Sequence, residues 1–435
     1  MGTPKHRKMG GASRWWLHHS LQSLDASLRG LGPPLLLRRG DAGQVISQLV
    51  RDTGAMAVYW NRCYEPHAIA RDSAIKAALT ADGIEAKSFN AALLFEPWTV
   101  STKTNGPYKV FTPFWRACTN NAPPAEPVDA PKTLTPPEQL PPGDTLDDWL
   151  LLPRSPDWAS EFGACWMPGE AGARKSLDTF IAHRMASYAE GRDSPAEPLT
   201  SHLSPHLHFG EIGPRQIWHA IDRRKTGAEK FLAEIGWREF AHHLLFHFPT
   251  IPEENLRPAF DDFPWRDDAD GLKAWQHGQT GYPIVDAGMR QLWRTGWMHN
   301  RVRMIAASFL IKDMLIDWRA GEKWFWDTLV DADLANNAAG WQWVAGSGAD
   351  AAPFFRIFNP VTQGEKFDPA GRYVRKFIPE ISALPDKWIH RPWDAPDDVL
   401  KAAGITLGMT YPLPIVDHKA ARQRALTAFR EIRTV

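Results

Sequence analysis

Gly296–Ser347 reads GWMHNRVRMIAASFLIKDMLIDWRAGEKWFWDTLVDADLANNAAGWQWVAGS and holds the densest set of aromatic and paired polar residues in the chain. Within it Asp333, Asn337 and Trp341 are spaced at i, i+4 and i+8, so a helix would place them on one face. This face suits a redox cofactor, because a carboxylate and an amide can hydrogen-bond the polar edge of a flavin and an indole can pass it an electron. The alternative is a buried amphipathic helix whose polar groups are merely satisfied.

The composition sets limits on the fold and on the partners. At 435 residues the chain is too long for one core, so we expect two domains. The formal net charge is zero, so nucleic-acid binding would depend on a local basic patch. Cys63, Cys118 and Cys165 lie far apart and form no C-x-x-C motif, which predicts a reduced, cytoplasmic protein without structural zinc. The apolar run Met304–Ile311 is too short to cross a bilayer, and we expect no signal peptide and no membrane partner.

The first part of the chain alternates short apolar runs with helical periodicity, which predicts a parallel α/β sheet with right-handed crossovers. We expect helices at Ser13–Leu31, Ala42–Asp52 and His67–Asp82, strands at Pro34–Leu37 and Met56–Trp60, and a further apolar run at Ala91–Phe95. Eight prolines between Ala122 and Pro142 then indicate an extended linker.

From Leu146 onward the strand signals nearly vanish, which predicts an all-helical domain. We expect helices at Lys175–Glu190, Pro214–Arg224, Ala228–Phe248, Leu272–Gln276, Ile284–Thr295, Val302–Ile316 and Asp417–Ile432. The predicted organisation is an α/β domain at 1–121, a Pro-rich linker at 122–150 and a larger helical domain at 151–435. Of the 21 tryptophans, 15 follow Leu150, so the aromatic chemistry is expected in the helical domain.

Two further motifs each allow a functional and a structural interpretation. In Thr200–Pro205, Ser204 is placed as an N-cap and Pro205 as the first helical residue, which makes either an anion site for a diphosphate or an ordinary capped helix. In Ala228–Phe248, one helical face carries Glu234, Trp237 and Arg238. The indole can stack on a base and the carboxylate can hydrogen-bond it, or Glu234 and Arg238 simply form an intrahelical pair.

The helix at Ala228–Phe248 also carries histidines, of which His243 and His247 have the spacing of a helical metal site. There is no H-E-x-x-H motif and no third ligand follows, so we expect no metal.

Several long strings resemble the photolyase/cryptochrome family, specifically the bacterial cyclobutane pyrimidine dimer photolyases. They are GYPIVDAGMRQL, TGWMHNRVRM, DADLANNAAGWQW and DAAPFFRIFNPVTQGEKFD, together with TSHLSPHL and WREF. The resemblance covers nearly the whole chain. It implies a lyase with a U-folded FAD in the helical domain, in which light drives an electron from the reduced flavin to a dimer flipped out of UV-damaged DNA.

The resemblance also implies a role for particular residues around the flavin. Tyr188, Thr200, Ser201, His202, Leu203 and Ser204 would hold the phosphates and the ribityl chain. Arg303 and Asp331 would form an ion pair beside the isoalloxazine, Asp333 would lie at its polar edge and Asn337 would face N5. Trp341, Trp318 and Trp265 would form an electron relay from the flavin to the surface, which serves photoreduction and not repair itself.

On the substrate side, the resemblance places Glu234, Asn300 and Met304 around the dimer, with Trp237 and Trp343 packing against it and Arg238 on the same helix face as Glu234. Arg192, Arg301 and Arg356 would hold phosphates around the lesion. Extruding a dimer costs less than extruding a normal pair, because the lesion already weakens stacking and pairing. The related (6–4) photolyases carry a histidine in the lesion pocket where this chain has Met304, which favours the cyclobutane lesion.

The chain departs from the family in two places. It starts past the family's first βαβ segment, so we expect an α/β domain that lacks this segment and part of its sheet. Phe231 stands where close relatives often have tryptophan near the flavin, and a phenylalanine should still pack. The antenna chromophore, either a folate or a deazaflavin if one is present, is left open.

Two other functions are weighed against repair. A cryptochrome-like photoreceptor would share the flavin and the relay, but such proteins often append a long tail, whereas this chain stops at Val435, soon after its last expected helix. A light-independent DNA-binding module would need neither the helix face with Asp333, Asn337 and Trp341 nor the tryptophan relay. We therefore expect light-driven DNA repair by a monomer.

Overall fold

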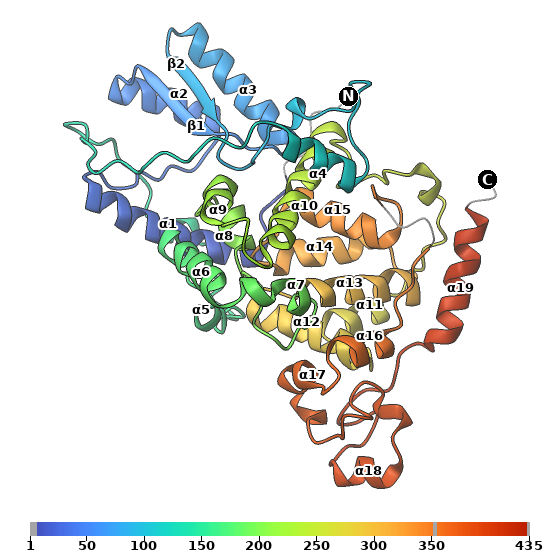
Figure 1. Cartoon of the computed structure of the whole chain (residues 1–435). Helices are drawn as coiled ribbons and strands as arrows, with labels where there is room; N and C mark the ends of the chain where they lie inside the picture. Colours follow the sequence, from blue (N-terminus) through green and yellow to red (C-terminus); the bar gives the residue numbers. More distant parts are fainter. Residues whose placement is uncertain (1–6, 351–354, 433–435) are drawn as a thin grey trace. The chain divides into compact units, whose positions relative to one another are not determined.

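The structure is a computed structural model that describes residues 7–350 and 355–432. The Cα positions divide the chain into two compact units that alternate along the sequence (Figure 1). The first unit comprises Met1–His183 and Ser201–Pro249, and the second comprises Arg184–Thr200 and Thr250–Val435. In the described parts of both units helices predominate, as expected for the second half of the chain.

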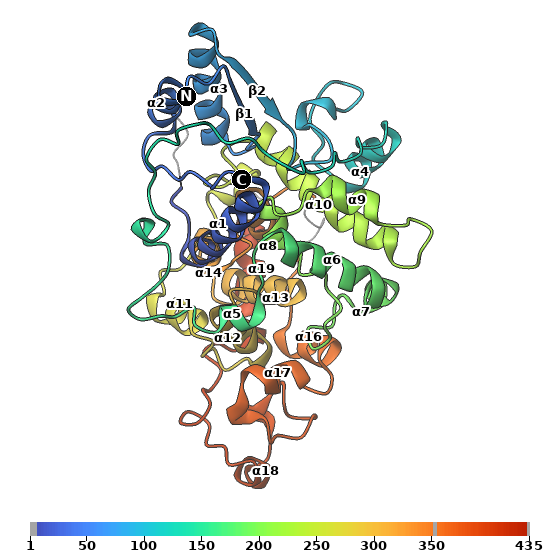
Figure 2. The ribbon, with the colours of Figure 1, turned by 90° about the vertical axis from the view of Figure 1, so that its left-hand side faces the viewer.

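The first unit contains a small parallel sheet. Strand β1 (Ala57–Asn61) pairs with β2 (Glu85–Phe89), with Ala57 opposite Glu85 and Asn61 opposite Phe89. Helix α3 (Pro66–Ala81) connects the two strands and lies beside them in both views (Figure 2). The parallel sheet was predicted correctly from the sequence, and the strand expected at Met56–Trp60 is displaced by one residue.

The other strand assignments were wrong. Residues 34–37 are irregular, because Pro33 and Pro34 have no N–H group to donate to a ladder. Residues 91–95 are also irregular, and the second strand is instead the charged segment EAKSF. Its exposed and half-buried residues alternate with the period of a strand, but Glu85 and Lys87 pair with each other on the exposed side, so the segment lacks an apolar signal.

Helices make up the rest of the regular structure in the first unit. They are α1 (Gly11–Leu31), α2 (Ala42–Thr53), α4 (Phe111–Asn120), α5 (Phe162–Cys165), α6 (Glu170–His183), α8 (Ser204–His208), α9 (Pro214–Ala220) and α10 (Ala228–His247). The Pro-rich segment at 122–142 has neither helix nor strand, as predicted. The helix expected at Lys175–Glu190 stops at His183, and a short 3₁₀ turn at Met185–Ser187 separates it from α7 (Tyr188–Gly191) of the second unit.

The second unit is helical in its described residues. Besides α7 it contains α11 (Ala269–Gln276), α12 (Pro283–Thr295), α13 (Asn300–Ser308), α14 (Trp318–Thr328), α15 (Leu334–Ala345), α16 (Pro360–Phe367), α17 (Arg372–Phe377), α18 (Asp397–Ala402) and α19 (His418–Glu431). The continuous helix expected at Val302–Ile316 was wrong. It becomes a π-helix at Phe309–Asp313 and ends before Leu315, whose φ is +56°. Such π turns often mark functional positions.

Helices α14 and α15 pack closely in the core of the second unit (Figure 1). Trp318, Phe325 and Trp341 from these helices are buried there. The approach depends on Gly321 of α14, because a Cβ atom at this position would lie 2.1 Å from Cη2 of the Trp341 ring. Only a residue without a side chain allows the two helices to approach this closely.

The contact at Gly321 can be tested by substitution. Gly321→Ala should lower the free energy of unfolding by about 1–3 kcal/mol, because the methyl group would overlap the Trp341 ring. Gly340→Ala is the matched control, since a Cβ atom there meets nothing within 4 Å, and it should be neutral or stabilising by up to about 1 kcal/mol. Urea unfolding of the flavin-loaded proteins measures both. Equal midpoints for the two variants would rule out the packing constraint.

Candidate functional site

The stripe predicted on the helix at 333–341 is present, but it begins at the helix cap. Asp333 is the N-cap of α15 and its carboxylate accepts hydrogen bonds from the Asn336 backbone N–H at 2.8 Å and from Asn336 Nδ2 at 2.6 Å. Asn337 and Trp341 follow at helical spacing, and Trp341 is buried with 3% of its surface exposed. The carboxylate therefore both caps the helix and stands at the end of the stripe.

The side chain of Asn337 is held in one orientation. Its Nδ2 group donates to the backbone oxygen of Glu322 at 3.0 Å and to the Glu322 carboxylate at 2.8 Å. Both partners are acceptors, so the amino group of the amide must face them. The amide oxygen of Asn337 consequently points away from Glu322 and can accept a hydrogen bond from a bound molecule.

Arg303 and Asp331 form the ion pair expected from the family resemblance. Arg303 Nη2 lies 3.1 and 2.9 Å from the two carboxylate oxygens of Asp331, and its Nε donates to the Met298 carbonyl at 2.7 Å. The Asp331 side chain is 4% exposed. The pair thus supplies a buried acceptor and a half-buried donor in the same unit as the stripe.

Two of the three tryptophans assigned to the relay, Trp318 and Trp341, belong to one buried hydrophobic cluster of the second unit, and Trp265 packs against it. Trp318 is fully buried and its Nε1 donates to Asn255 Oδ1 at 3.0 Å. Trp265 is half-buried and packs against the cluster, with its ring 4.5 Å from that of Phe263. Trp341 contacts Phe325, with ring centroids 5.0 Å apart. The second unit therefore contains two buried indoles and one half-buried indole at the positions assigned to the relay.

The residues expected at the flavin phosphates are divided between the two units. In the second unit, Tyr188 is buried at the start of α7, and the Arg192 guanidinium lies 5.5 Å from its ring centroid. Thr200 ends this segment, and its carbonyl accepts a hydrogen bond from Arg184 at 3.0 Å.

The segment Ser201–Ser204 belongs to the first unit and leads into α8. Leu203 occupies the N-cap position and Ser204 is the first helical residue, so the assignment of Ser204 as the N-cap was wrong by one residue. Ser201 Oγ accepts a hydrogen bond from the Leu203 N–H at 3.4 Å. His202 adopts a left-handed φ of +55°, which turns the chain immediately before the helix.

The polar residues of α10 have partners different from those expected. Arg238 donates to the Ala92 carbonyl at 2.6 Å and lies 3.8 Å from the Glu239 carboxylate, whereas Glu234 lies 3.7 Å from Lys230. Trp237 is half-buried, because its ring stacks on Phe111 of α4 at a centroid distance of 3.8 Å. The face of α10 that carries Glu234, Trp237 and Arg238 is therefore partly covered.

Glu239 is a buried carboxylate that the sequence analysis did not single out. It is 3% exposed and accepts hydrogen bonds from the backbone N–H groups of Leu94 and Phe95 at 2.9 and 3.1 Å. Burial raises the pKa of Glu239, and the Arg238 charge and the two N–H groups oppose this rise. The Glu239 carboxylate accepts the backbone N–H groups that a strand partner would otherwise accept, so residues 91–95 are held in place without forming a strand.

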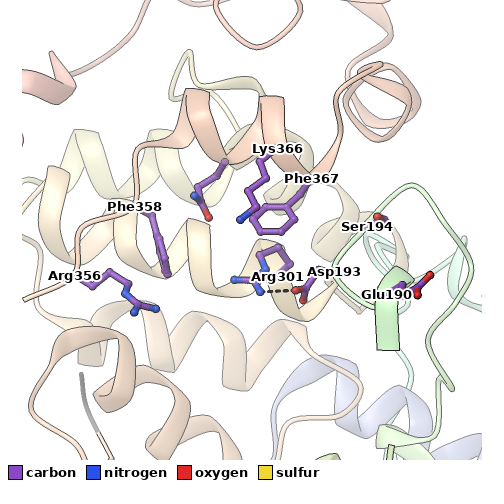
Figure 3. A pocket seen from close by; sticks show the side chains of 9 residues that line it. Glu190, Asp193, Ser194, Arg301, Arg356, Phe358, Lys366 and Phe367 are labelled. Carbon is purple, nitrogen blue, oxygen red and sulfur yellow. Dashed lines mark hydrogen bonds and ion pairs between the residues drawn. The ribbon is translucent and has the colours of Figure 1, made fainter. Parts of the chain in front are cut away.

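A cavity of about 570 Å³ lies in the second unit (Figure 3). It brings together two of the predicted phosphate-binding residues, Arg301 and Arg356. The remaining lining residues are Glu190, Asp193, Ser194, Phe358, Gln363, Lys366 and Phe367. Lys366 and Phe367 come from α16 and were not predicted, although they lie within the string that carries the family resemblance.

The other residues predicted to contact the lesion lie on α13 and α15. Asn300 is the exposed first residue of α13, and Met304 is half-buried one turn later on the same helix. Trp343 is half-buried on α15, where its Nε1 donates to the Asp350 carbonyl at 3.2 Å. Asn300 and Met304 thus share one helix face at the i, i+4 spacing.

A buried charged cluster supports the segment that carries Arg356. Lys312 of the π-helix is 3% exposed, donates to the Arg356 carbonyl at 2.5 Å and lies 4.3 Å from the Phe355 ring centroid. The neighbouring Asp313 is fully buried and pairs with His418. Burial lowers the pKa of Lys312 to about 7, against the attraction of Asp313.

No group of three or more His, Cys, Asp and Glu side chains in residues 7–350 and 355–432 could hold a metal ion. Among the helices of these same ranges, none is long and apolar enough to cross a membrane.

Comparison with known proteins identifies the family. Residues 231–431 match the FAD-binding domain of DNA photolyase, and residues 2–132 match the DNA photolyase family. The chain is 57% identical to a deoxyribodipyrimidine photo-lyase of Agrobacterium fabrum, over 98% of this chain and 90% of that protein. It is 42% identical to cryptochrome-1 of Arabidopsis thaliana, over 98% of this chain and 65% of the cryptochrome.

A solved structure agrees with the sequence comparisons. The crystal structure of a bacterial class III photolyase from Agrobacterium tumefaciens matches with a TM-score of 0.97 and 56% identity, over 99% of this chain and 91% of that chain. This chain therefore belongs to the DNA photolyase family. It contains the family's FAD-binding domain, and its cofactor is FAD.

The low pKa of Lys312 has a consequence for stability. An unfolded lysine keeps its proton up to its ordinary pKa of 10.5, whereas folded Lys312 loses it near pH 7. Between these values the unfolded chain binds more protons, so the contribution of Lys312 to the unfolding free energy rises with pH. We expect Lys312→Met to remove this rise in urea unfolding measured from about pH 7 to 10.

Lys323→Met is the matched control, because Lys323 is exposed on α14. Its unfolding free energy should follow the wild-type pH dependence. If Lys312→Met runs parallel to the wild type across this range, then Lys312 keeps its proton in the folded protein and the argument from burial is wrong.

Proposed function

We propose that this protein is a deoxyribodipyrimidine photolyase, a carbon-carbon lyase that uses light to split cyclobutane pyrimidine dimers in UV-damaged DNA. The observation that carries the proposal is the fixed Asn337 amide beside the buried Trp341, in a chain 57% identical to a photolyase over nearly its full length. Bound FAD, when reduced, supplies the electron that light drives to the dimer. Recovery of the ultraviolet absorbance of thymine bases from dimer-containing DNA under blue light tests the activity.

The donors and acceptors of the second unit fit a flavin. The oxygen of the Asn337 amide is free of Glu322, and it can accept a hydrogen bond from a protonated ring nitrogen. Asp333 offers a carboxylate at the N-terminus of α15, and the Arg303–Asp331 pair offers both a cation and an anion. We assign Tyr188 and Thr200 of this unit, and Ser201–Ser204 of the first unit, to the phosphates and the ribityl chain.

We assign Trp341, Trp318 and Trp265 to electron supply from the surface. The packing of all three in or against one hydrophobic cluster supports this role, because a relay needs indoles separated by packed side chains and not by water. Trp265 is the partly exposed member, which suits the outer end of such a relay. The hydrogen bond from Trp318 to Asn255 keeps the middle indole in a single orientation.

The residues that bind DNA are proposed unit by unit. In the second unit, Arg301 and Arg356 would hold phosphates with Arg192, while Asn300, Met304 and Trp343 would contact the dimer. The shared cavity of Arg301 and Arg356 supports the phosphate role, since two guanidinium groups there can each pair with a phosphate. In the first unit, Glu234 and Trp237 would meet the lesion, and Arg238 would hold the main chain near Ala92.

The second candidate is a cryptochrome-like photoreceptor, which the 42% identity with cryptochrome-1 of Arabidopsis favours. The two candidates share the flavin and the tryptophans, so flavin photochemistry does not separate them. Splitting of dimers per absorbed photon does, because only a photolyase gives turnover. The higher identity and the 90% coverage of the Agrobacterium photo-lyase favour repair.

We further propose that the protein works as a monomer in the cytoplasm. Its cysteines Cys63, Cys118 and Cys165 are all free thiols, which suits a reducing compartment. Residues 1–121 would form the α/β domain, 122–150 the linker and 151–435 the domain that binds FAD and DNA.

The relay is tested by Trp341→Phe. The variant should lose nearly all photoreduction of its flavin under blue light with an external reductant, because the indole on the same helix face as Asn337 is removed. Dimer splitting by chemically pre-reduced protein should survive, since that electron does not pass through the indoles. Trp388→Phe, at a half-buried tryptophan of the same cluster, is the control and should photoreduce normally. Normal photoreduction in Trp341→Phe would exclude the relay.

Glu234 is tested with two substitutions on α10. A carboxyl that carries its proton can donate a hydrogen bond to a dimer that has gained an electron. Glu234→Gln keeps an amide donor and should retain much of the repair per absorbed photon at saturating damaged DNA, whereas Glu234→Ala should lose it while keeping FAD. Glu229→Gln, at an exposed position of the same helix, should behave as wild type. Unchanged repair in Glu234→Ala would leave Glu234 a structural role alone, such as its ion pair with Lys230.

A further inference from the structure

Asp193 lies between two of the arginines assigned to DNA phosphates. Its Oδ2 accepts a hydrogen bond from Arg301 Nη2 at 2.8 Å, and its Oδ1 lies 3.9 Å from Arg192 Nε. In the cavity the Arg301 and Asp193 side chains point toward one another from different segments of the second unit (Figure 3). One carboxylate therefore interacts with two cations that DNA would also need.

Arg301 depends on Asp193 for its charge-paired hydrogen bond. Its guanidinium lies 4.4 Å from the Phe367 ring centroid, its Nη1 lies 4.0 Å from Met304 Sδ, and its Nε is buried without a hydrogen-bond partner. The side chains of Arg301 and Asp193 are 19% and 38% exposed. The ion pair is thus accessible to an incoming phosphate. The other contacts of the Arg301 guanidinium, with Phe367 and Met304, are weaker than its hydrogen bond to Asp193.

A carboxylate in a phosphate-binding cavity opposes binding. Asp193 and Glu190 both line the cavity that contains Arg301, Arg356 and Lys366, so two of its five charged groups repel a DNA backbone. The whole chain has no net charge, so its attraction for DNA depends on such local balances. If the cavity served only to maximise affinity, the two carboxylates would be a disadvantage.

We propose that Asp193 is a specificity-determining residue that withholds Arg301 from the phosphates of undamaged DNA. The inference rests on the proposed function. A phosphate that binds at Arg301 Nη2 must displace the carboxylate, and exchanging one anion for another yields little net attraction. An undamaged duplex offers no further contacts to complete the exchange. A lesion-containing duplex does, because the extruded dimer adds contacts elsewhere on the protein.

The experiment compares wild type with Asp193→Asn in the dark, using a duplex with one thymine dimer and the same duplex undamaged. Fluorescence anisotropy gives Kd for both at a series of salt concentrations. Asp193→Asn should bind the undamaged duplex more tightly and lower the ratio of the two Kd values. Its salt slope on undamaged DNA should steepen by about 0.9, the contribution of one additional phosphate contact.

Two controls isolate the effect. Asp398→Asn removes an exposed carboxylate of α18 and measures the effect of one negative charge alone. In an Arg301→Gln background, Asp193→Asn should change binding much less, since only the longer contact with Arg192, at 3.9 Å, is then released. Melting temperature and flavin absorbance establish that each variant is folded.

The outcomes separate the alternatives. If Asp193→Asn weakens binding of both duplexes equally, the carboxylate only orients Arg301 and the inference is overturned. It is also overturned if the variant matches Asp398→Asn, or if its gain is undiminished without Arg301. If the wild type itself does not prefer the damaged duplex, the proposed repair function fails instead, which is a distinct result.

Discussion

The close approach of α14 to α15 is the constraint on which the candidate flavin site depends. Gly321 lets the backbone of α14 lie against the Trp341 ring, and the next residue, Glu322, is thereby brought to Asn337. Both the carbonyl and the carboxylate of Glu322 then fix the amide one turn before Trp341. A single missing side chain thus determines the orientation of an amide that a cofactor can use, which links packing directly to chemistry.

The second unit also retains charged groups in its interior at a cost in desolvation. Arg303 and Asp331 are paired through two oxygens, and Asp313 is buried against His418 beside Lys312. Such groups seldom add net stability compared with apolar residues of similar volume. Their value lies in geometry. The Arg303–Asp331 pair places a cation and an anion side by side. Lys312 donates a hydrogen bond to the carbonyl of Arg356, whose side chain lines the cavity.

Helical periodicity was a good guide to the fold, and strand assignment was not. The helices at 42–53 and 283–295 were predicted to within about a residue, because their apolar positions recur at helical spacing and their ends carry caps or glycine. The strand at 85–89 was missed, since its exposed face carries Glu85 and Lys87. The π-helix at 309–313 could not be predicted, because its residues continue the apolar pattern of an ordinary helix. That pattern does not show that Lys312 and Asp313 are buried.

The site shows the same division between what a chain encodes locally and what only the fold decides. The spacing of Asp333 and Asn337 predicted their shared face, because one short segment carries both residues. The Arg303–Asp331 pair joins positions 28 residues apart, and it was predicted from the family resemblance alone. The pairing of Asp193 with Arg301 joins positions 108 residues apart, and no periodicity reports it. For a protein without net charge, contacts of this kind would set how strongly a phosphate is attracted, so the selectivity for DNA that we propose would be a property of the folded cavity and not of composition.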